Sequence, residues 1–125
     1  MGISLKQLES AIKKSWDRET CHYKFLWDDK ELPGSAGHCR VVSLIVQNFL
    51  GGEIIYSYVR GNPKWDHYWN KLPNGKEIDL TKDQFPKNIK FVKSKIISRK
   101  EALSSKRTQR GYEILKKRVK KILEC

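Results

Sequence analysis

The sequence predicts one α+β domain over residues 1–125. A core helix that carries Cys39 packs on an antiparallel sheet of about four strands, and helices at the two chain ends flank it. Three observations predict this. The run from Cys39 to Leu50 is apolar and precedes two glycines, typical of a buried helix with a glycine stop. Residues 53–97 contain short β-rich runs between turn residues, and both ends of the chain show the apolar spacing of amphipathic helices.

A first helix is expected over residues 4–17. Ser4 followed by Gln7 is a capping-box pattern, in which each side chain bonds the backbone N–H of the other residue. Apolar residues then recur at helical spacing: Leu5, Leu8, Ile12 and Trp16. Residues 18–37 are polar and rich in turn formers, so we expect an irregular loop that leads into the core helix at Cys39.

Four strands are expected after the core helix, over residues 53–59, 65–72, 76–81 and 89–97. A turn at Gly61-Asn62-Pro63 separates the first two strands. Ser98 is placed to cap a short helix over residues 99–105. The chain then ends in a helix whose apolar stripe is expected to face the core: Tyr112, Leu115, Val119 and Ile122.

The loop between the second and third strands decides which side chains share a face of the sheet. A two-residue turn at Asn74-Gly75 would place His67 and Asp79 on opposite faces, because side chains alternate along a strand. Pro73 favours a three-residue loop instead. Its fixed φ suits the second position of a type I turn, and the glycine that follows can take the left-handed conformation.

With that three-residue loop, Leu72 pairs with Lys76, and His67 and Asp79 become diagonal neighbours on one face. Their Cβ atoms are then within roughly 7 Å of each other, close enough for an imidazole–carboxylate hydrogen bond.

Cys39, His67 and Asp79 together fit the requirements of an activated cysteine nucleophile. The N-terminus of a helix carries partial positive charge, which favours the thiolate form of a cysteine in its first turn. A carboxylate at one ring nitrogen of His67 fixes the tautomer, and the other nitrogen then takes the thiol proton of Cys39. We therefore expect these three residues to form a catalytic triad.

The backbone N–H of Cys39 can donate to the oxyanion of a tetrahedral intermediate. The sequence leaves three candidates for a second donor, namely His38, Trp27 and Gln84. Trp65 and Trp69 stand on either side of His67 and are expected to wall the cleft or fill the core.

Each member of the triad also has a purely structural interpretation. Cys39 can be a small core residue, since free cysteine is among the most buried residue types. His67 can be a hydrogen-bonded strand histidine, and Asp79 can cap the turn at Thr81. The three residue types in this order, on a helix start and two adjacent strands, favour the catalytic interpretation.

The formal net charge of +12 is concentrated in the last third of the chain. Residues 1–92 contain 14 Lys and Arg against 11 Asp and Glu, whereas residues 93–125 contain 12 against 3. Such a surface can bind phosphates or acidic proteins, and Trp27, Trp65 and Trp69 could stack on bases. The alternative function is therefore a non-catalytic binding module for nucleic acid or an acidic protein partner. A solvated helix face explains the same charges, so nucleic acid is not the favoured partner.

Cys21, Cys39 and Cys125 are odd in number and lack CxxC spacing, which argues against a disulfide framework and a zinc site. His22 and His38 stand directly beside cysteines, but adjacent side chains point apart and chelate poorly. We expect no metal and no cofactor. No apolar stretch approaches the roughly 20 residues that cross a bilayer, and no signal peptide is recognisable. The expectation is a cytoplasmic protein without a membrane partner.

Two segments, GHCRVVSLIVQNFLGGEI and HYWNKLPNGKEIDLTKDQF, resemble the YunG-like family of small bacterial proteins. The resemblance is close over residues 37–86 and looser over residues 16–33 and in the C-terminal RGYEILKKRV. It implies the papain-like cysteine-protease fold that this family is thought to adopt.

The resemblance places the Cys, His and Asp of the family motif on Cys39, His67 and Asp79. The family pattern commonly has Gln immediately before the Cys, where this chain has His38. If that Gln helps to bind the oxyanion, His38 either substitutes as the donor or alters the activity.

We therefore expect a thiol-dependent acyl hydrolase or acyltransferase of papain-like fold. Amide or isopeptide cleavage, deamidation and acyl exchange all begin with the same thioester intermediate. The substrate would be a peptide, a protein or a small amide or ester. Use of this fold against a host target, as in an effector or toxin, is a third alternative without specific support, since a fold does not fix a function.

Overall fold

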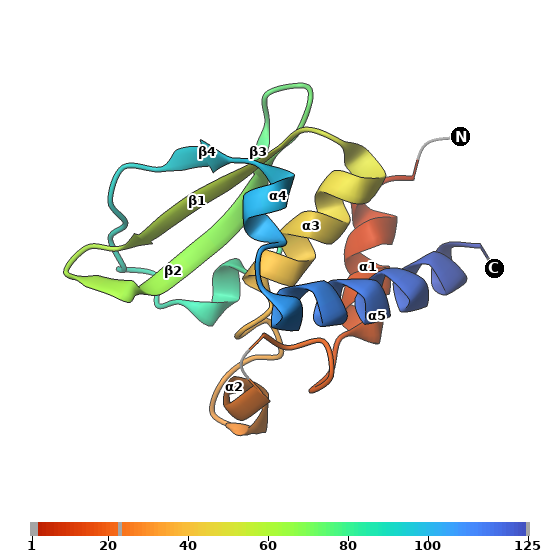
Figure 1. The fold of residues 1–125 in the computed structure, drawn as a ribbon, viewed down its shortest axis with the longest axis horizontal. Helices are drawn as coiled ribbons and strands as arrows, with labels where there is room; N and C mark the ends of the chain where they lie inside the picture. Colours follow the sequence, from red (N-terminus) through yellow and green to blue (C-terminus); the bar gives the residue numbers. More distant parts are fainter. Residues whose placement is uncertain (1–2, 23, 125) are drawn as a thin grey trace.

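The computed structural model describes residues 3–22 and 24–124 and has the α+β architecture that the sequence predicts (Figure 1). Over these residues the chain contains five α-helices and one open antiparallel sheet with the strand order β3-β2-β1-β4. The strands are β1 (Glu53–Val59), β2 (Asn62–Lys71), β3 (Glu77–Ile78) and β4 (Lys95–Ile97). Figure 1 shows the longer helices gathered at one side of the sheet. None of the helices in the described residues is long and apolar enough to cross a bilayer.

Helix α1 (Leu5–Ser15) begins with the predicted capping box. Ser4 Oγ accepts from the Gln7 N–H at 3.1 Å, and Gln7 Oε1 accepts from the Ser4 N–H at 3.0 Å. The helix is slightly shorter than predicted because Trp16 is already in an extended conformation. Leu8 and Ile12 are fully buried, as their spacing predicts.

The loop between α1 and the core helix contains a short helix that the sequence did not reveal, α2 (Lys24–Asp28). Five residues are too few to show a helical period, so pattern analysis cannot detect such an element. Arg18 Nε donates to Asp28 Oδ1 at 3.0 Å and ties the end of α2 to the start of the loop.

Helix α3 (Cys39–Leu50) is the core helix, and it begins at Cys39 as predicted. Leu44, Ile45 and Val46 are fully buried, and the helix packs against β2 and the C-terminal helix. Gly51 ends it with a φ of 77°, a conformation that glycine adopts without steric cost.

Strands β1 and β2 form an antiparallel hairpin that is longer than predicted. β2 begins at Asn62 rather than Trp65, because the chain turns at Arg60 and Gly61 instead of at Gly61-Asn62-Pro63. The pairing shifts register between Tyr58 and Val59. A bulge of this kind allows Pro63 to lie in a strand that otherwise needs its N–H groups.

The β2–β3 hairpin has the predicted register. Lys71 pairs with Glu77, and the Leu72 N–H donates to Lys76 O at 2.8 Å. Gly75 has a φ of 89°, as the three-residue loop requires. β3 is only two residues long, whereas a strand over residues 76–81 was expected. Asp79 ends it early, because its side chain accepts the Thr81 N–H at 3.2 Å and closes a local turn.

The strand expected over residues 89–97 is reduced to β4 and an isolated bridge between Val59 and Phe91. β4 pairs Lys95 with Tyr56. The pair Val59–Phe91 and the pair Tyr56–Lys95 differ by one residue in register, so the strand is interrupted between Phe91 and Lys95. Ser57 fills the gap by donating its hydroxyl to Val92 O at 2.8 Å.

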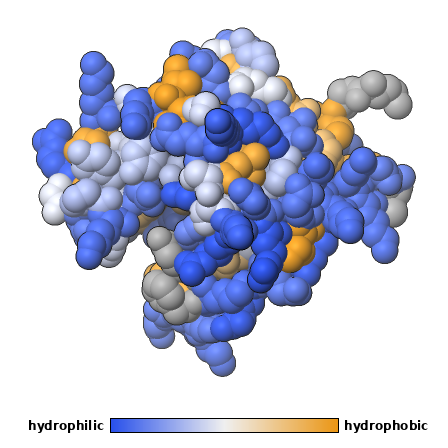
Figure 2. Space-filling model, viewed as in Figure 1, coloured by the Kyte–Doolittle hydropathy of each residue, from blue (hydrophilic) through white to orange (hydrophobic). Residues whose placement is uncertain are grey.

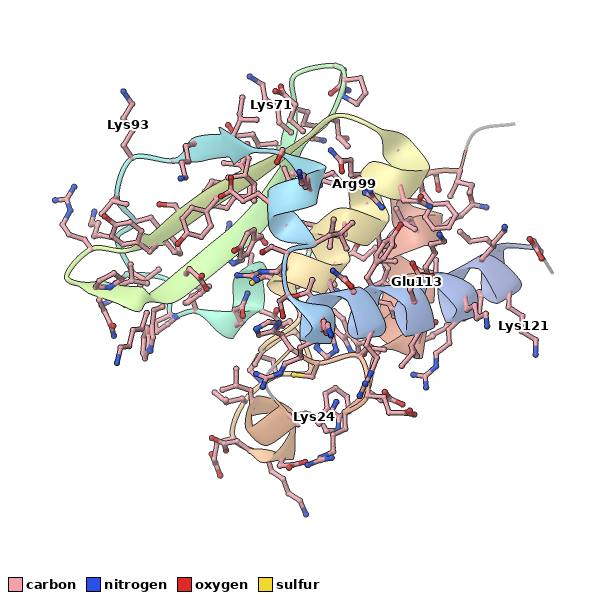
Figure 3. All side chains as sticks on the ribbon, in the orientation of Figure 1. Lys24, Lys71, Lys93, Arg99, Glu113 and Lys121 are labelled. Carbon is pink, nitrogen blue, oxygen red and sulfur yellow. The ribbon has the colours of Figure 1, made fainter. Side chains whose placement is uncertain are left out.

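Ser98 caps α4 (Arg99–Ala102), as predicted, and Arg99 reaches α3, where it donates to Gln47 Oε1 at 2.9 Å (Figure 3). The final helix is α5 (Lys106–Leu123). Its stripe is buried at Tyr112, Leu115 and Val119, but the prediction is wrong for Ile122, which is 39 % exposed. Ile122 is in the last turn of α5, and Figure 1 shows this end of the helix extending past α1. Hydrophilic residues dominate the face shown in Figure 2.

Candidate active site

Cys39 is the first residue of α3 and carries a reduced thiol that is almost completely buried. His38 precedes it without capping the helix through its side chain. The backbone N–H groups of the first turn therefore point out of the helix end, and the helix dipole places partial positive charge beside the sulfur. A thiolate is stabilised at such a position.

His67 is buried on β2, and both of its ring nitrogens have partners. Its Nε2 lies 2.5 Å from Asp79 Oδ2, its Nδ1 lies 3.1 Å from Gln84 Nε2, and the Cys39 side chain is close enough to raise the pKa of the ring. Because Asp79 occupies Nε2, Nδ1 is the nitrogen that can exchange a proton with the thiol. Burial by itself lowers the pKa of His67, but the hydrogen bonds to Asp79 and Cys39 together outweigh it and raise the pKa to about 9.

Asp79 follows directly after β3, and its two oxygens have separate partners. Oδ1 accepts from the Thr81 N–H at 3.2 Å and from the Thr81 hydroxyl at 3.4 Å, which leaves Oδ2 for His67. The expectation that His67 and Asp79 lie on the same face of the hairpin is thereby confirmed. The turn that shortens β3 is also what fixes the carboxylate.

Aromatic rings enclose His67 on the face of β2 opposite α3. Trp69 and Phe91 stack on the imidazole with centroid distances of 5.5 and 5.7 Å, and Phe85 meets it edge-on at 4.9 Å. On the other face of the strand, Asn70 Nδ2 donates to Ser43 O of α3 at 2.9 Å. The rings exclude water from the imidazole and strengthen its hydrogen bonds to charged partners.

Two cavities flank this cluster. The first, here called the Cys39 cavity, has a volume of about 530 Å³ and includes Cys39, Trp65 and Gln84 in its wall. Trp65 is 51 % exposed, which is unusual for so large an apolar side chain.

The second, here called the His67 cavity, has a volume of about 740 Å³ and includes His67, Trp69 and Asp79 in its wall. Trp69 therefore lies apart from the Cys39 cavity, and its indole N–H donates to Glu77 Oε1 at 2.7 Å. The segment that contains Asp83, Phe85 and Pro86 lines both cavities, so the two are adjacent.

His38, the first of the oxyanion candidates, has both ring nitrogens bonded inside the core. Its ring is fully buried, with Nε2 2.7 Å from Thr20 Oγ1 and Nδ1 2.8 Å from Gly34 O. It also stacks on Trp16 with a centroid distance of 5.1 Å. Burial lowers the pKa of His38 to about 4, although the hydrogen bond to Gly34 opposes the shift. His38 is a neighbour of Cys39 in the sequence, but its side chain turns into the core.

The other two donor candidates are in different surroundings. Trp27 packs edge-on against His38 at 5.8 Å and is not among the residues that line the Cys39 cavity. Gln84 does line this cavity, and its Nε2 lies 3.1 Å from His67 Nδ1. Its Oε1 accepts the Gly37 N–H at 3.4 Å, which links Gln84 to the backbone just before Cys39.

Two further side chains line the Cys39 cavity, Arg40 and Asp83, and neither was predicted from the sequence as a site residue. Arg40 donates to the Tyr68 hydroxyl, lies over the Tyr68 ring and approaches Asp66 at 3.8 Å. Asp83 accepts a hydrogen bond from the Ser35 hydroxyl and ties the segment after β3 to the loop before α3. Among the described residues, no group of three His, Cys, Asp or Glu side chains could hold a metal ion.

Comparison with known proteins agrees with the sequence motif. The family model described as YunG protein matches residues 4–124 of this chain. The chain is also similar to the Uncharacterized protein YunG of Bacillus subtilis (strain 168), with 32 % identity over 87 residues that cover 70 % of this chain and 68 % of the relative. No solved structure matches it. Because the family model matches residues 4–124, almost the whole chain, the chain belongs to the YunG protein family.

Proposed function

We propose that this protein is a thiol-dependent acyl hydrolase or acyltransferase of papain-like architecture. In this proposal Cys39 is the nucleophile, His67 is the general base and acid, and Asp79 orients the imidazole and favours its protonated form. The observation that carries the proposal is that the His67 ring contacts Asp79 through Nε2, while the Cys39 side chain acts on the same ring and helps to raise its pKa. A thiol at a helix start, followed along the chain by His and Asp on a packed antiparallel hairpin, also fits a papain-like arrangement.

The reaction begins with transfer of the Cys39 proton to His67 Nδ1. The thiolate then attacks the carbonyl carbon of an amide or ester, so that an S–C bond forms and the carbonyl electron pair moves onto oxygen. Collapse of this intermediate breaks the C–N or C–O bond, and His67 returns its proton to the leaving amine or alcohol. Water or a second nucleophile finally displaces Cys39 from the thioester and gives an acid, an amide or an ester.

Gln84 is the side-chain oxyanion donor in this proposal. Its Nε2 lies 3.1 Å from His67 Nδ1, and its amide N–H donates to this nitrogen when the ring is neutral. When Nδ1 takes the thiol proton it no longer accepts, and the amide N–H is released within the cavity that contains Cys39. The backbone N–H of Cys39 supplies the other donor, so both act only once charge develops on the substrate oxygen.

Competitive alkylation tests the nucleophile. The protein is treated with limiting iodoacetamide at pH 6.5, and the labelled peptides that contain Cys39, Cys21 and Cys125 are quantified by mass spectrometry. Cys39 is expected to react first, and His67→Ala is expected to slow its labelling by about tenfold or more, since one pKa unit corresponds to a factor of ten. Labelling of Cys39 that is no faster than that of Cys21, or that ignores His67→Ala, would refute the triad.

A further inference from the structure

We infer that the substrate carries a bulky apolar group on the acyl side of the cleaved bond, and that this group occupies the Cys39 cavity. The inference rests on the proposed function, because it uses the roles of Cys39 as the nucleophile that keeps the acyl group and of His67 as the acid that protonates the leaving group. It narrows the substrate class from amides and esters in general to those with a leucine-like or aromatic acyl side chain.

The chemistry assigns each cavity to one half of the substrate. The acyl half remains attached to Cys39 Sγ in the thioester, whereas the other half leaves with a proton from His67. The wall of the Cys39 cavity includes Cys39 and not His67, and the wall of the His67 cavity includes His67 and not Cys39. The acyl half therefore lies in the Cys39 cavity, and the leaving half lies toward the His67 cavity.

The wall of the Cys39 cavity is mainly apolar. Seven of its side chains are aliphatic or carry an apolar ring: Leu26, Leu32, Ala36, Trp65, Tyr68, Phe85 and Pro86. Trp65 is half-exposed at this wall, so an apolar ligand would cover surface that now faces water. A volume of about 530 Å³ is in the range of small-molecule pockets and accepts one large side chain with its flanking main chain.

Two charged groups of the same wall, Arg40 and Asp83, already have partners. Arg40 bonds the Tyr68 hydroxyl and pairs with Asp66, while Asp83 is held by Ser35. A charged acyl side chain placed against either group would have to break one of these contacts or be buried without a partner, and either costs free energy. Lys64, the other cation of the wall, is exposed to solvent, where an ion pair with a carboxylate contributes little. An apolar side chain needs no such exchange.

A series of activated esters tests the inference on the whole protein. The p-nitrophenyl esters of N-acetyl-leucine, N-acetyl-phenylalanine, N-acetylglycine and N-acetylaspartate differ only in the acyl side chain. Acylation forms the Sγ–C bond and breaks the C–O bond, and p-nitrophenolate leaves with the electron pair and is measured by absorbance. Mass spectrometry locates the acyl group at Cys39, and Cys39→Ser reports reaction at other side chains.

The leucine and phenylalanine esters are expected to acylate Cys39 at least about tenfold faster than the glycine and aspartate esters. A tenfold ratio corresponds to about 1.4 kcal/mol, which burial of a large apolar side chain supplies. Trp65→Ala and Leu32→Asp are expected to reduce this preference. Ile96→Asp, at an exposed apolar position outside both cavities, is the matched control.

Three outcomes are distinguishable. A preference that Trp65→Ala and Leu32→Asp reduce and Ile96→Asp leaves intact supports the inference. Glycine or aspartate esters that acylate Cys39 as fast as the leucine ester overturn the inference and leave the proposed function standing. Failure of every ester to acylate Cys39 overturns both.

Discussion

Gln84 Nε2 lies 3.1 Å from His67 Nδ1, the ring nitrogen opposite the one that binds Asp79. An amide N–H can only donate, so this contact requires that Nδ1 carry no proton. The Thr81 hydroxyl accepts the other amide hydrogen at 3.2 Å, and the Gly37 N–H binds the amide oxygen. Three contacts thus fix the amide, and it is the neutral form of His67 that Gln84 recognises.

Replacement of Gln84 by Ala is therefore expected to have two effects. The pKa of His67 rises above its value in the unaltered protein, because a hydrogen bond to the neutral form has been lost. Acylation by the leucine ester slows by about 100-fold or more, the cost of removing one oxyanion donor. NMR titration of His67 and the p-nitrophenolate burst measure the two effects.

Gln84→Glu is the matched control, since it keeps the size of the side chain and replaces its donor with an acceptor. If Gln84 only packs against its neighbours, this variant retains the acylation rate. Retention of that rate by both variants would remove Gln84 from the proposed mechanism.

Asp79→Ala is expected to lower the pKa of His67 from about 9, because burial then acts with only the Cys39 hydrogen bond against it. A larger share of His67 is then neutral at pH 7, and the thiolate–imidazolium pair is less populated. Alkylation of Cys39 at pH 7 should fall by about tenfold or more. Asp79→Asn, which retains an acceptor without the charge, should give an intermediate rate. Unchanged alkylation in both variants would contradict the assigned role of Asp79.

The hairpin register was predictable because two residues with restricted conformations stand in its loop. Pro73 has a fixed φ and no N–H, and Gly75 can occupy the left-handed region, so few loops are compatible with both. Once the loop length was known, the alternation of side chains placed His67 and Asp79 on one face. Local sequence was sufficient because the contact joins residues only 12 apart.

The surroundings of the triad were less predictable because they depend on tertiary packing. His38 stands beside Cys39 in sequence, yet its ring turns away to bond Thr20 and Gly34. Phe91 reaches His67 from a segment whose strand is broken by a change of register. No local pattern encodes either contact, so no sequence signal would have identified them.

Stability against acid is expected to depend on His38. Its pKa is about 4 in the folded protein and 6.5 in an unfolded chain, so between these values the unfolded chain binds a proton that the folded protein does not. Stability is therefore lost as the pH falls from 6.5 toward 4, by on the order of 3 kcal/mol from this residue.

His38→Gln keeps both hydrogen-bonding groups at this position and removes the titration. Urea unfolding at several pH values should show that the variant loses less stability than the unaltered protein over the same interval. The carboxylates titrate in both proteins, so their contribution cancels in the comparison. Parallel pH dependences for the two proteins would refute this account of His38.

Two glycines with nearly equal φ should respond differently to alanine. Gly52 has a φ of 85°, and a Cβ there would lie 2.2 Å from Lys71 O, a backbone atom that cannot move without disturbing β2. Gly61 has a φ of 86° and open space around it. Gly61→Ala should cost about 1 kcal/mol from conformation alone, and Gly52→Ala at least about 2 kcal/mol more. Equal unfolding midpoints in urea would show that the hairpin can shift to relieve the contact.

The basic C-terminal helix tests the binding-module alternative. Part of its charge is already engaged, since Arg118 pairs with Asp17 at 2.9 Å and Glu19 at 3.1 Å, and Lys116 lies over the Tyr112 ring. Figure 3 shows Lys121 extending away from the fold, and Tyr112, the one aromatic residue of α5, is buried. We therefore expect single- and double-stranded oligonucleotides to bind only at low salt and to dissociate near about 0.15 M salt, as non-specific charge attraction predicts.

Filter binding with two charge-matched variants decides between the alternatives. One replaces four lysines in the second half of α5 with glutamine (Lys116, Lys117, Lys120 and Lys121), and the other replaces four lysines outside α5 with glutamine (Lys13, Lys14, Lys30 and Lys71). Equal loss of the low-salt binding in both variants is the expected result, because only net charge matters for a non-specific surface. Tight binding that persists near about 0.15 M salt and is lost only in the α5 variant would make this helix a specific site, since screening at that ionic strength removes weaker contacts. The binding-module alternative would then be favoured over the acyl-transfer proposal.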